Sequence, residues 1–577
     1  MKHKDFDSAK DVARILLDVL AEHGVADIVC SPGSRNAPLL IAADARLDIN
    51  TPVVIDERSA AFVALGMAMV SRRPVALICT SGSALLNYAP AVAEAYYHGI
   101  PLIVISADRP LEWIDQDDSQ TIRQPHTLDN IVKGSYSISD REEGDRPGWY
   151  ENRVANDAML NALADKPGPV HINVRLSPPL GQLRPFGADH VGERIIRNVI
   201  PYTTPDRAVT RELASQLTGR RVMIVAGFME PDARLNRAVA KMAANENVAV
   251  MAETISNLHL PPEAYAVDSA LCMLDENDER YLAPDVVISV GGALVSRMLK
   301  EFLRRCAARN PQLQHWAIGH SHTTVDPFQT LTCRIEADPG RMLTAIAGEL
   351  THLARTAPTA QPKTEYASVW LSRKRLGMQR MERLTREAPW CDLKAYSSIL
   401  SRLPKSANLF LSNGTSIRYA QILSRSIPHA EYSNRGVSGI DGSTSTAIGG
   451  ALMYAHDTFL LTGDTSFAYD LSALLTLQRL QARLKIILVS NGGGAIFRFI
   501  SSTAQLECRE SLFCTDPALP AEGLATAFGI PYRKADSADE LHAALNWIAR
   551  QDGCALLEVV TPAEVSAEIL RNALARN

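Results

Sequence analysis

Short apolar runs that alternate with helical patterns constrain the fold of this chain more than any other feature. In the first third, VALICTSGS and IPLIVISADRP have the length of buried strands, and NAPLLIAADAR has the spacing of a helix. Strands that are apolar on both faces and alternate with helices predict a parallel sheet that helices cover on both sides. Because ligands of such sheets bind at the carboxyl ends of the strands, the polar turns after these runs form the first candidate site.

The same pattern returns twice later in the chain. A stretch with RVMIVAGFM and DVVISVGGALVS follows a proline-rich connector near residues 177–207, and a stretch with TFLLTGD and KIILVSNGGG follows a linker at 354–365. A chain of 577 residues is too long for a single hydrophobic core. We therefore predict an α/β protein with three doubly wound parallel-sheet domains. Their expected ranges are residues 1–185, 186–360 and 361–577.

The composition excludes several classes of protein. Hydrophobic residues make up 46% and charged residues 21%, as in ordinary globular proteins, and a net charge of −5 suggests no basic patch for nucleic acid or an anionic membrane. The longest apolar runs are too short to span a membrane, and charges interrupt the N-terminal helical pattern, unlike a signal peptide. The nine cysteines form no C-x-x-C pair that would indicate a zinc site. We expect a cytoplasmic protein with small-molecule substrates and with no nucleic-acid or membrane partner.

Two turns in the last third predict a metal site. Asp464 ends the strand-like run TFLLTGD, and Asn491 ends KIILVSN, with one helical stretch between them. A right-handed crossover brings both ends to the same edge of a parallel sheet, where a carboxylate and an amide oxygen suit Mg²⁺. Glycines at 492–494 allow backbone groups to approach an ion closely. Either turn alone is common in loops, and only the pair at this spacing favours a site.

These residues resemble the GDG…N signature of thiamine-diphosphate-dependent enzymes, although Thr465 stands where the second glycine of the signature is expected. The resemblance implies α/β domains of that enzyme type and a thiamine diphosphate cofactor held through Mg²⁺ or Mn²⁺. The metal ligands would be Asp464, Asn491 and the carbonyl of Gly493. Further cofactor contacts would come from Asn491, Gly463, Thr465 and Ser466.

A second element of this family is a glutamate in the N-terminal domain, after a strand and at the head of a helix. In the family it hydrogen-bonds the aminopyrimidine ring of the cofactor and thereby activates it. The stretch VVIDERSAAFVALGMAMV places Glu57 at that point, as the candidate catalytic residue. The alternative is an acid that only interacts with the helix dipole, a role that Asp56 beside it would serve equally well.

Six further motifs resemble the branch of this family that acts in menaquinone biosynthesis. They are SPGSR at 31–35, IDER at 55–58, TSGSALLN at 80–87, SADRP at 106–110, TIRQP at 121–125 and SNRGVSGIDGSTSTAIGG at 433–450. The resemblance implies decarboxylation of 2-oxoglutarate and conjugate addition of the remaining succinyl semialdehyde unit to isochorismate. Both substrates are dianions, and guanidinium groups bind carboxylates through paired hydrogen bonds. The candidate arginines are Arg35, Arg109, Arg297, Arg418 and Arg435.

Smaller side chains complete the site that the resemblance implies. Ser34, Ser119 and Gln120 would contact the substrate. Ile440 would hold the cofactor bent. Ile496 and Phe497 would form an apolar wall beside its reactive ring.

Three positions depart from this branch. Ser119 stands where members commonly have Asn, and Gly414 replaces a Ser that some members carry. Met298 occupies a position where some members have a second basic residue, which leaves Arg297 and Lys300 as the nearby cations.

Other functions remain open at this point. A different thiamine-diphosphate decarboxylase, or a carboligase like acetohydroxyacid synthase, would use the same Glu57 and Asp464 but needs no arginine cluster. A catalytically silent protein on this scaffold would lack those two acids, and a nicotinamide dehydrogenase would show a G-x-G-x-x-G turn after a strand. In the family, the two acids that meet at one cofactor come from different subunits. The resemblance therefore implies a homo-oligomer, either a dimer or a dimer of dimers.

Overall fold

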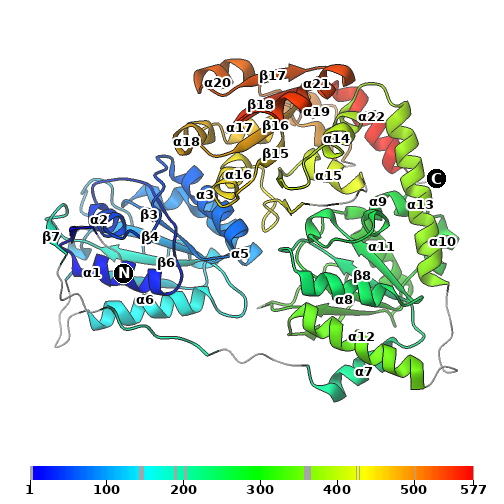
Figure 1. Ribbon diagram of the computed structural model, residues 1–577, viewed down its shortest axis with the longest axis horizontal. Coiled ribbons are helices and arrows are strands. Elements are labelled where there is room, and N and C mark those ends of the chain that lie inside the picture. The colour runs from blue at the N-terminus through cyan, green and yellow to red at the C-terminus, as the bar shows by residue number, and fades with distance from the viewer. Residues whose placement is uncertain are drawn as a thin grey trace.

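The computed structural model describes residues 4–141, 148–186, 192–199, 205–321, 323–356, 365–423, 425, 427, 429–500 and 502–575. In this part of the chain three parallel sheets follow one another along the sequence, and helices pack on each (Figure 1). The prediction of an α/β protein with parallel sheets is confirmed. The domain boundaries stay a prediction. Residues 357–364, which include the boundary at 360–361, and residues 187–191 and 200–204 of the first connector lie outside the described residues.

The N-terminal unit is the sheet with strand order β2-β3-β4-β6-β5 and its helices. Its strands are β2 (Ile28–Cys30), β3 (Val75–Cys79), β4 (Leu102–Asp108), β5 (Ser135–Ser139) and β6 (Val170–Arg175). Its helices are α1 (Asp11–Glu22), α2 (Ala37–Ala45), α3 (Glu57–Ser71), α4 (Ser83–Asn87), α5 (Ala89–His98) and α6 (Trp149–Ala162), and a short antiparallel pair joins β1 (Phe6–Ser8) to β7 (Leu183–Pro185). Strands β3 and β4 are buried along their whole length because helices cover both faces.

The central unit is the sheet with strand order β12-β11-β10-β8-β9. Its strands are β8 (Val222–Ala226), β9 (Val248–Ala252), β10 (Val286–Val290), β11 (Gln314–Ile318) and β12 (Leu331–Ile335). Its helices are α7 (Arg207–Leu217), α8 (Ala233–Ala243), α9 (Val267–Leu271), α10 (Glu276–Tyr281), α11 (Arg297–Arg309) and α12 (Pro339–Thr356). Asp206 and Asp232 cap α7 and α8 by accepting hydrogen bonds from the first free backbone N–H groups.

The C-terminal unit is the sheet with strand order β14-β13-β15-β16-β18-β17. Its strands are β13 (Asn408–Leu411), β14 (Glu431–Tyr432), β15 (Thr458–Gly463), β16 (Leu484–Ser490), β17 (Tyr532–Ala535) and β18 (Ala555–Val560). Its helices are α13 (Tyr366–Glu387), α14 (Asp392–Leu400), α15 (Thr415–Ile422), α16 (Ser443–Leu452), α17 (Asp464–Tyr469), α18 (Ala473–Leu480), α19 (Arg509–Leu512), α20 (Ala521–Ala527), α21 (Ala538–Ile548) and α22 (Ala563–Leu574). The long helix α13 runs from the central unit to the C-terminal unit (Figure 1).

Helices α3 and α16 pack against each other where the N-terminal and C-terminal units meet (Figure 1). A methyl group on Gly66 of α3 would lie 1.9 Å from the carbonyl oxygen of Thr446. One on Gly449 of α16 would lie 1.9 Å from the carbonyl oxygen of Val63. The two helix backbones therefore touch, which only glycine permits at these two positions.

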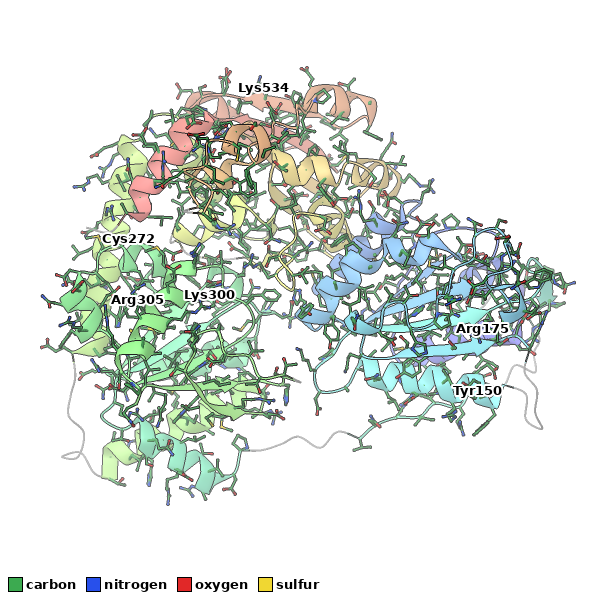
Figure 2. All side chains as sticks on the ribbon, turned by 180° about the vertical axis from the view of Figure 1, so that it is seen from behind. Tyr150, Arg175, Cys272, Lys300, Arg305 and Lys534 are labelled. Carbon is green, nitrogen blue, oxygen red and sulfur yellow. The ribbon has the colours of Figure 1, made fainter. Side chains whose placement is uncertain are left out.

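The central unit meets the C-terminal unit through smaller contacts. The Sγ of Cys272, which is labelled in Figure 2, lies 3.3 Å from the carbonyl oxygen of Leu574. None of the described helices is long and apolar enough to cross a membrane.

Four strands without a solid apolar run lie at sheet edges, namely β5, β12, β14 and β17. Each carries polar residues, as in SYSIS of β5 and YRKA of β17. Strands β5, β12 and β17 are partly exposed and do not require apolar side chains on both faces, whereas both residues of β14 are buried. The runs that stood out in the sequence are therefore mainly the inner strands.

Candidate active site

The predicted metal ligands lie together at the carboxyl end of the C-terminal sheet. Strands β15 and β16 are parallel neighbours, so Asp464 at the first residue of α17 faces the turn after β16. Its Oδ2 accepts hydrogen bonds from the backbone N–H groups of Asn491, at 3.0 Å, and Gly493, at 2.8 Å. The crossover expected from the sequence therefore brings the three residues into one buried cluster.

Asp392 holds the side chain of Asn491 in one orientation. The Nδ2 of Asn491 donates to Asp392 Oδ2 at 3.0 Å, and Thr561 donates to Asp392 Oδ1 at 2.5 Å. Burial raises the pKa of Asp392 to about 6, although the hydrogen bonds from Thr561 and Asn491 act in the opposite direction. Because the amide nitrogen is engaged, the amide oxygen of Asn491 remains the free acceptor for a cation. The sequence contains no signal for this contact.

The turn at 492–494 uses glycine for its conformation and for space. All three residues have positive φ, at 80°, 73° and 56°. A methyl group on Gly493 would lie 2.1 Å from Thr515 O, and one on Gly494 2.5 Å from Phe513 O. The carbonyl of Gly493 accepts a 3.4 Å hydrogen bond from Arg498. A carboxylate, an amide oxygen and a backbone carbonyl are the hard oxygen donors that fit Mg²⁺.

The two hydroxyls expected at the diphosphate bind the protein. Thr465 Oγ1 accepts from the N–H of Gly494 at 3.2 Å, and Ser466 Oγ donates to the carbonyl of Ile440 at 2.7 Å. They tie the glycine turn and the Ile440 segment to α17. Gly463, the last residue of β15, has open space beside its Cα.

Glu57 is the first residue of α3, as the sequence predicts. Asp56 takes the capping role, since its Oδ1 accepts from the N–H groups of Arg58 at 2.9 Å and Ser59 at 3.3 Å. Within the described residues, no hydrogen bond to the half-buried carboxylate of Glu57 is found. Asp56 therefore serves as the acid that stabilises the start of the helix, and the carboxylate of Glu57 is available to a ligand.

Arg35 and Arg109 form a pair of cations at the carboxyl ends of β2 and β4. Burial lowers the pKa of the Arg35 guanidinium, and the charge of Arg109 lowers it further. Arg109 donates to the carbonyl of Ser119 at 3.1 and 2.7 Å and pairs with Asp118 at 2.5 Å. Ser119 makes this contact through its backbone, which Asn would equally provide. The side chains of Ser34 and Gln120 are exposed.

Arg418 and Arg435 form a second pair, between the C-terminal and central units. Burial and, to a smaller degree, the charge of Arg435 lower the pKa of Arg418 to about 10, although the charge of Asp268 acts in the opposite direction. Arg435 donates to Asn413 Oδ1 at 2.9 Å and to the carbonyl of Leu294 at 3.4 Å, while its Nε is buried without a partner among the described residues. Two interacting cations, of which Arg435 has a buried N–H group without a partner among the described residues, fit an anionic ligand.

Residues 290–300, which contain VGGALVSR, provide two further candidate cations near this second pair, Arg297 and Lys300. Arg297 is exposed and pairs with Glu301 at 2.6 Å. The partly buried Lys300, labelled in Figure 2, interacts electrostatically with Arg418 and Arg435, and burial lowers its pKa. Lys300 is therefore a second candidate cation of this stretch, beside the exposed Arg297.

The apolar candidates lie in the C-terminal unit. Ile440 is 37% exposed. Ile496 and Phe497 are half-buried in the short 3₁₀ helix after the glycine turn, and the ring centroid of Phe497 lies 5.5 Å from that of Phe513. Gly414 has a φ of 102° at the start of α15, a conformation that a Ser would adopt only with strain.

Comparison with known proteins identifies the family. Residues 10–128 match the family "Thiamine pyrophosphate enzyme, N-terminal TPP binding domain", and residues 413–559 match "Thiamine pyrophosphate enzyme, C-terminal TPP binding domain". A 2-succinyl-5-enolpyruvyl-6-hydroxy-3-cyclohexene-1-carboxylate synthase of Porphyromonas gingivalis is 38% identical, over 98% of this chain and 97% of the relative. The chain belongs to this synthase family. Synthases of Cytophaga hutchinsonii (37% identical, 92% of each chain) and Flavobacterium psychrophilum (35%, 97% of this chain and 98% of the relative) agree.

Membership in the synthase family confirms the branch that the motifs predicted. The chain is a thiamine-diphosphate-dependent enzyme of the transferase class, with a role in menaquinone biosynthesis. A solved structure, benzoylformate decarboxylase from Polynucleobacter necessarius, shares the fold with a TM-score of 0.69. It covers 96% of this chain and 99% of its own, at 17% identity.

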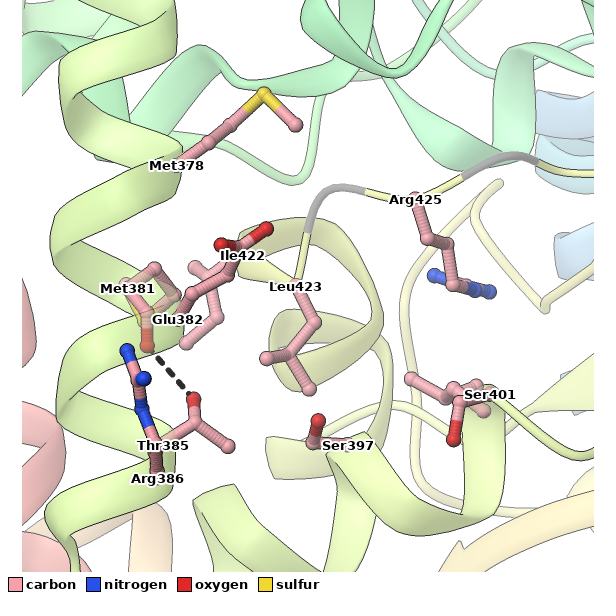
Figure 3. Close-up of a pocket in the computed structure, with 11 residues that line it drawn as sticks. Met378, Met381, Glu382, Thr385, Arg386, Ser397, Ser401, Ile422, Leu423 and Arg425 are labelled. Atoms are coloured by element: carbon pink, nitrogen blue, oxygen red, sulfur yellow. Dashed lines mark hydrogen bonds between the residues drawn. The ribbon is translucent and has the colours of Figure 1, made fainter.

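One cavity of this synthase-family chain lies away from these residues. It has a volume of about 350 Å³ and lies between α13, α14 and the end of α15, lined by residues such as Met381, Leu400 and Leu423 (Figure 3). None of the candidate site residues lines it.

Proposed function

We propose that this chain decarboxylates 2-oxoglutarate and adds the remaining succinyl semialdehyde unit to isochorismate, with release of CO₂. The product would be 2-succinyl-5-enolpyruvyl-6-hydroxy-3-cyclohexene-1-carboxylate. The observation that carries this assignment is the two pairs of neighbouring arginines, Arg35 with Arg109 and Arg418 with Arg435. Two dianionic substrates require such an excess of positive charge, whereas a monocarboxylate such as pyruvate does not.

The residues present fit the cofactor and its metal. Asp464, Asn491 and the Gly493 carbonyl would hold Mg²⁺ or Mn²⁺, and with it the diphosphate beside Gly463, Thr465 and Ser466. When bound, thiamine diphosphate supplies an electron sink that stabilises the carbanion left by decarboxylation. Ile440, Ile496 and Phe497 would provide apolar contacts and keep water from the reacting atoms.

Glu57 would act on protons. Its carboxyl group, free of protein hydrogen bonds among the described residues, would hydrogen-bond a ring nitrogen of the aminopyrimidine and hold a proton there. Positioned proton transfer of this kind contributes about 10²- to 10⁴-fold to rates.

The arginines would bind the substrate carboxylates. Arg35 and Arg109, with Ser34, Ser119 and Gln120, would form one anion site at the N-terminal sheet. Arg418 and Arg435, supported by Lys300 and by Arg297 after a change of side-chain rotamer, would form the other.

We further propose that the active enzyme is a homodimer or a dimer of dimers. Among the described residues, no hydrogen bond or ion pair joins Arg35, Arg109 or Glu57 to the Asp464 cluster or to Arg418 and Arg435. Ile55 beside Glu57 is 54% exposed, and Tyr469 at the end of α17 is 52% exposed. Exposed apolar side chains next to both halves suit burial against a second copy, which would complete the site.

The test is turnover of purified protein with thiamine diphosphate, Mg²⁺, 2-oxoglutarate and isochorismate, followed by CO₂ release and isochorismate loss. We expect turnover to need both substrates, to stop when EDTA removes the metal, and to fall at least about 100-fold in Glu57→Gln. Asp56→Asn is the matched control, since it weakens only the cap of α3, at a cost of about 1 kcal/mol or less. Consumption of pyruvate with 2-oxoglutarate ignored would favour another decarboxylase or carboligase of the same superfamily.

A further inference from the structure

The loop at 433–440, here called the Arg435 loop, is held by the N-terminal unit of the same chain. Glu94 on α5 is 1% exposed, and both of its carboxylate oxygens accept backbone N–H groups of this loop. The N–H of Gly436 donates at 2.5 Å and that of Val437 at 2.8 Å. A methyl group on Gly436 would lie 2.4 Å from the carbonyl oxygen of Glu94, so the loop lies directly on the end of α5.

The two N–H groups that Glu94 binds follow Arg435 directly in the chain. On the other side of the loop, Asn413 Nδ2 donates to the carbonyls of Asn434 and Gly439, both at 2.7 Å. The backbone on each side of Arg435 is thereby fixed by a different unit. A movement of either anchor would displace the guanidinium, whose partners Asn413 and Leu294 lie in two separate units.

A buried histidine lies beside Glu94. His98, one turn further along α5, is 5% exposed at its side chain and lies 3.6 Å from Glu94 and 3.8 Å from Glu230 of the central unit. Burial lowers the pKa of His98, but its contacts with Glu230 and Glu94 outweigh this effect, and the net pKa is raised. The ring of Phe228 lies 4.0 Å from that of His98. All three units therefore meet at this cluster.

A carboxylate, rather than a neutral side chain, binds the two backbone N–H groups of the Arg435 loop. Two backbone N–H groups can be satisfied by neutral acceptors, and burying a carboxylate is costly even when it is paired. A carboxylate offers two strong acceptors in one rigid plane, so it fixes two successive peptide groups at once. Burial lowers the pKa of Arg435, and the charges of Glu253 and, to a smaller degree, Glu94 act against this effect.

We propose that Glu94 is a positioning residue for substrate binding, which holds the Arg435 loop so that Arg435 presents its guanidinium to a substrate carboxylate. The proposal rests on the proposed function, in which Arg435 binds a dicarboxylate. Glu94 itself would touch neither substrate nor cofactor. It acts through the backbone of the loop.

The first experiment compares Glu94→Gln with Glu230→Gln in steady-state kinetics of the full-length enzyme. The amide that Glu94→Gln introduces can accept only one of the two N–H groups and places an NH₂ group against the other. We expect the KM for at least one of the two dicarboxylates to rise about 10-fold or more in Glu94→Gln, with kcat reduced less than about 3-fold. Glu230→Gln removes the other carboxylate beside His98 without touching the loop, and should leave both KM values within about 2-fold.

The second experiment does not depend on turnover. Amide hydrogen exchange of peptides that contain Gly436 and Val437 should be faster in Glu94→Gln than in the wild type or in Glu230→Gln. Faster exchange in a protein that turns over neither substrate would contradict the proposed function and still support the anchoring of the loop. Unchanged exchange with unchanged KM values would overturn the proposal, as would equal losses in both variants. If Glu94→Gln does not fold, Glu94→Asp, with its carboxylate withdrawn by one methylene, should show the same changes to a smaller degree.

Discussion

The N-terminal and central sheets contain the same local arrangement of a histidine and a serine. In the N-terminal sheet, His171 of β6 lies 2.8 Å from the Oγ of Ser106 on the neighbouring strand β4. In the central sheet, His315 of β11 lies 2.7 Å from the Oγ of Ser289 on the neighbouring strand β10. Both imidazoles are buried, and burial lowers the pKa of each to about 4. A neutral histidine thus bridges two inner strands in both sheets.

The two arrangements differ in where their hydrogen bonds continue. Ser106 Oγ donates to Asn173 Oδ1 at 2.9 Å, and Gln124 donates to the same oxygen at 2.8 Å. Asn173 in turn donates to Asp108, which accepts the N–H of Arg109. Gln124 also accepts the N–H of Gly82 at 2.7 Å, in the turn after β3. The network in the N-terminal sheet therefore reaches Arg109, a candidate site residue, and the turn after β3.

In the central sheet, by contrast, the bridge ends close to its origin. His315 lies 3.8 Å from Asp326, and no further hydrogen bond of the Ser289 side chain is found among the described residues. The same histidine–serine hydrogen bond between strands can therefore serve strand packing alone, or can also support a binding site. The difference lies in what the next side chain on the strand can reach.

The largest effect on stability should come from replacing a helical glycine by alanine in the N-terminal unit, compared with the same substitution in the central unit. Gly66→Ala places a methyl group against the backbone of α16, and we expect a loss of about 3 kcal/mol or more in the free energy of unfolding. Gly348→Ala in helix α12 meets no atom within 4 Å and should stabilise by up to about 1 kcal/mol. Urea unfolding measures both. A loss in Gly348→Ala, or none in Gly66→Ala, would contradict the contrast.

An intermediate effect should come from breaking the two hydrogen-bond networks. Asn173→Leu removes one buried hydrogen bond from each of Ser106, Gln124 and Asp108, and we expect a loss of about 2–3 kcal/mol with a raised KM for substrate. Ser289→Ala removes one hydrogen bond in the central sheet and should cost about 1 kcal/mol with unchanged kinetics. Thermal unfolding and steady-state kinetics on the same samples separate these outcomes. Equal kinetic losses in the two variants would show that the networks do not differ in function.

Substitution of the two histidines should have the smallest effect on the free energy of unfolding at neutral pH, since both imidazoles are already neutral there. The folded pKa of about 4 lies below the ordinary 6.5, so the unfolded chain binds more protons between these values. The stability that this difference contributes is complete above pH 6.5 and is lost as the pH falls towards 4. His315→Gln and His171→Gln should each make the acid loss shallower, as measured by unfolding at a series of pH values. An unchanged slope in both variants would count against this origin.

The sequence predicted much of the site because its residues stand at strand ends. Asp464 and Asn491 follow solid apolar runs, and parallel strands joined by a crossover bring such ends together. Glu57 was placed at the head of a helix, and α3 begins there. The role of Arg297 in substrate binding stays a prediction, and in the structure its exposed side chain pairs with Glu301.

By itself the sequence determined the fold class and the family, because apolar runs and short motifs are properties of neighbouring residues. Only the tertiary structure decided which distant groups meet. Glu94 binds Gly436, Asp392 orients Asn491, and α3 touches α16 through two glycines. Such contacts depend on distances and angles between segments far apart in the chain, and a single Glu, Asp or Gly carries no local pattern that announces them.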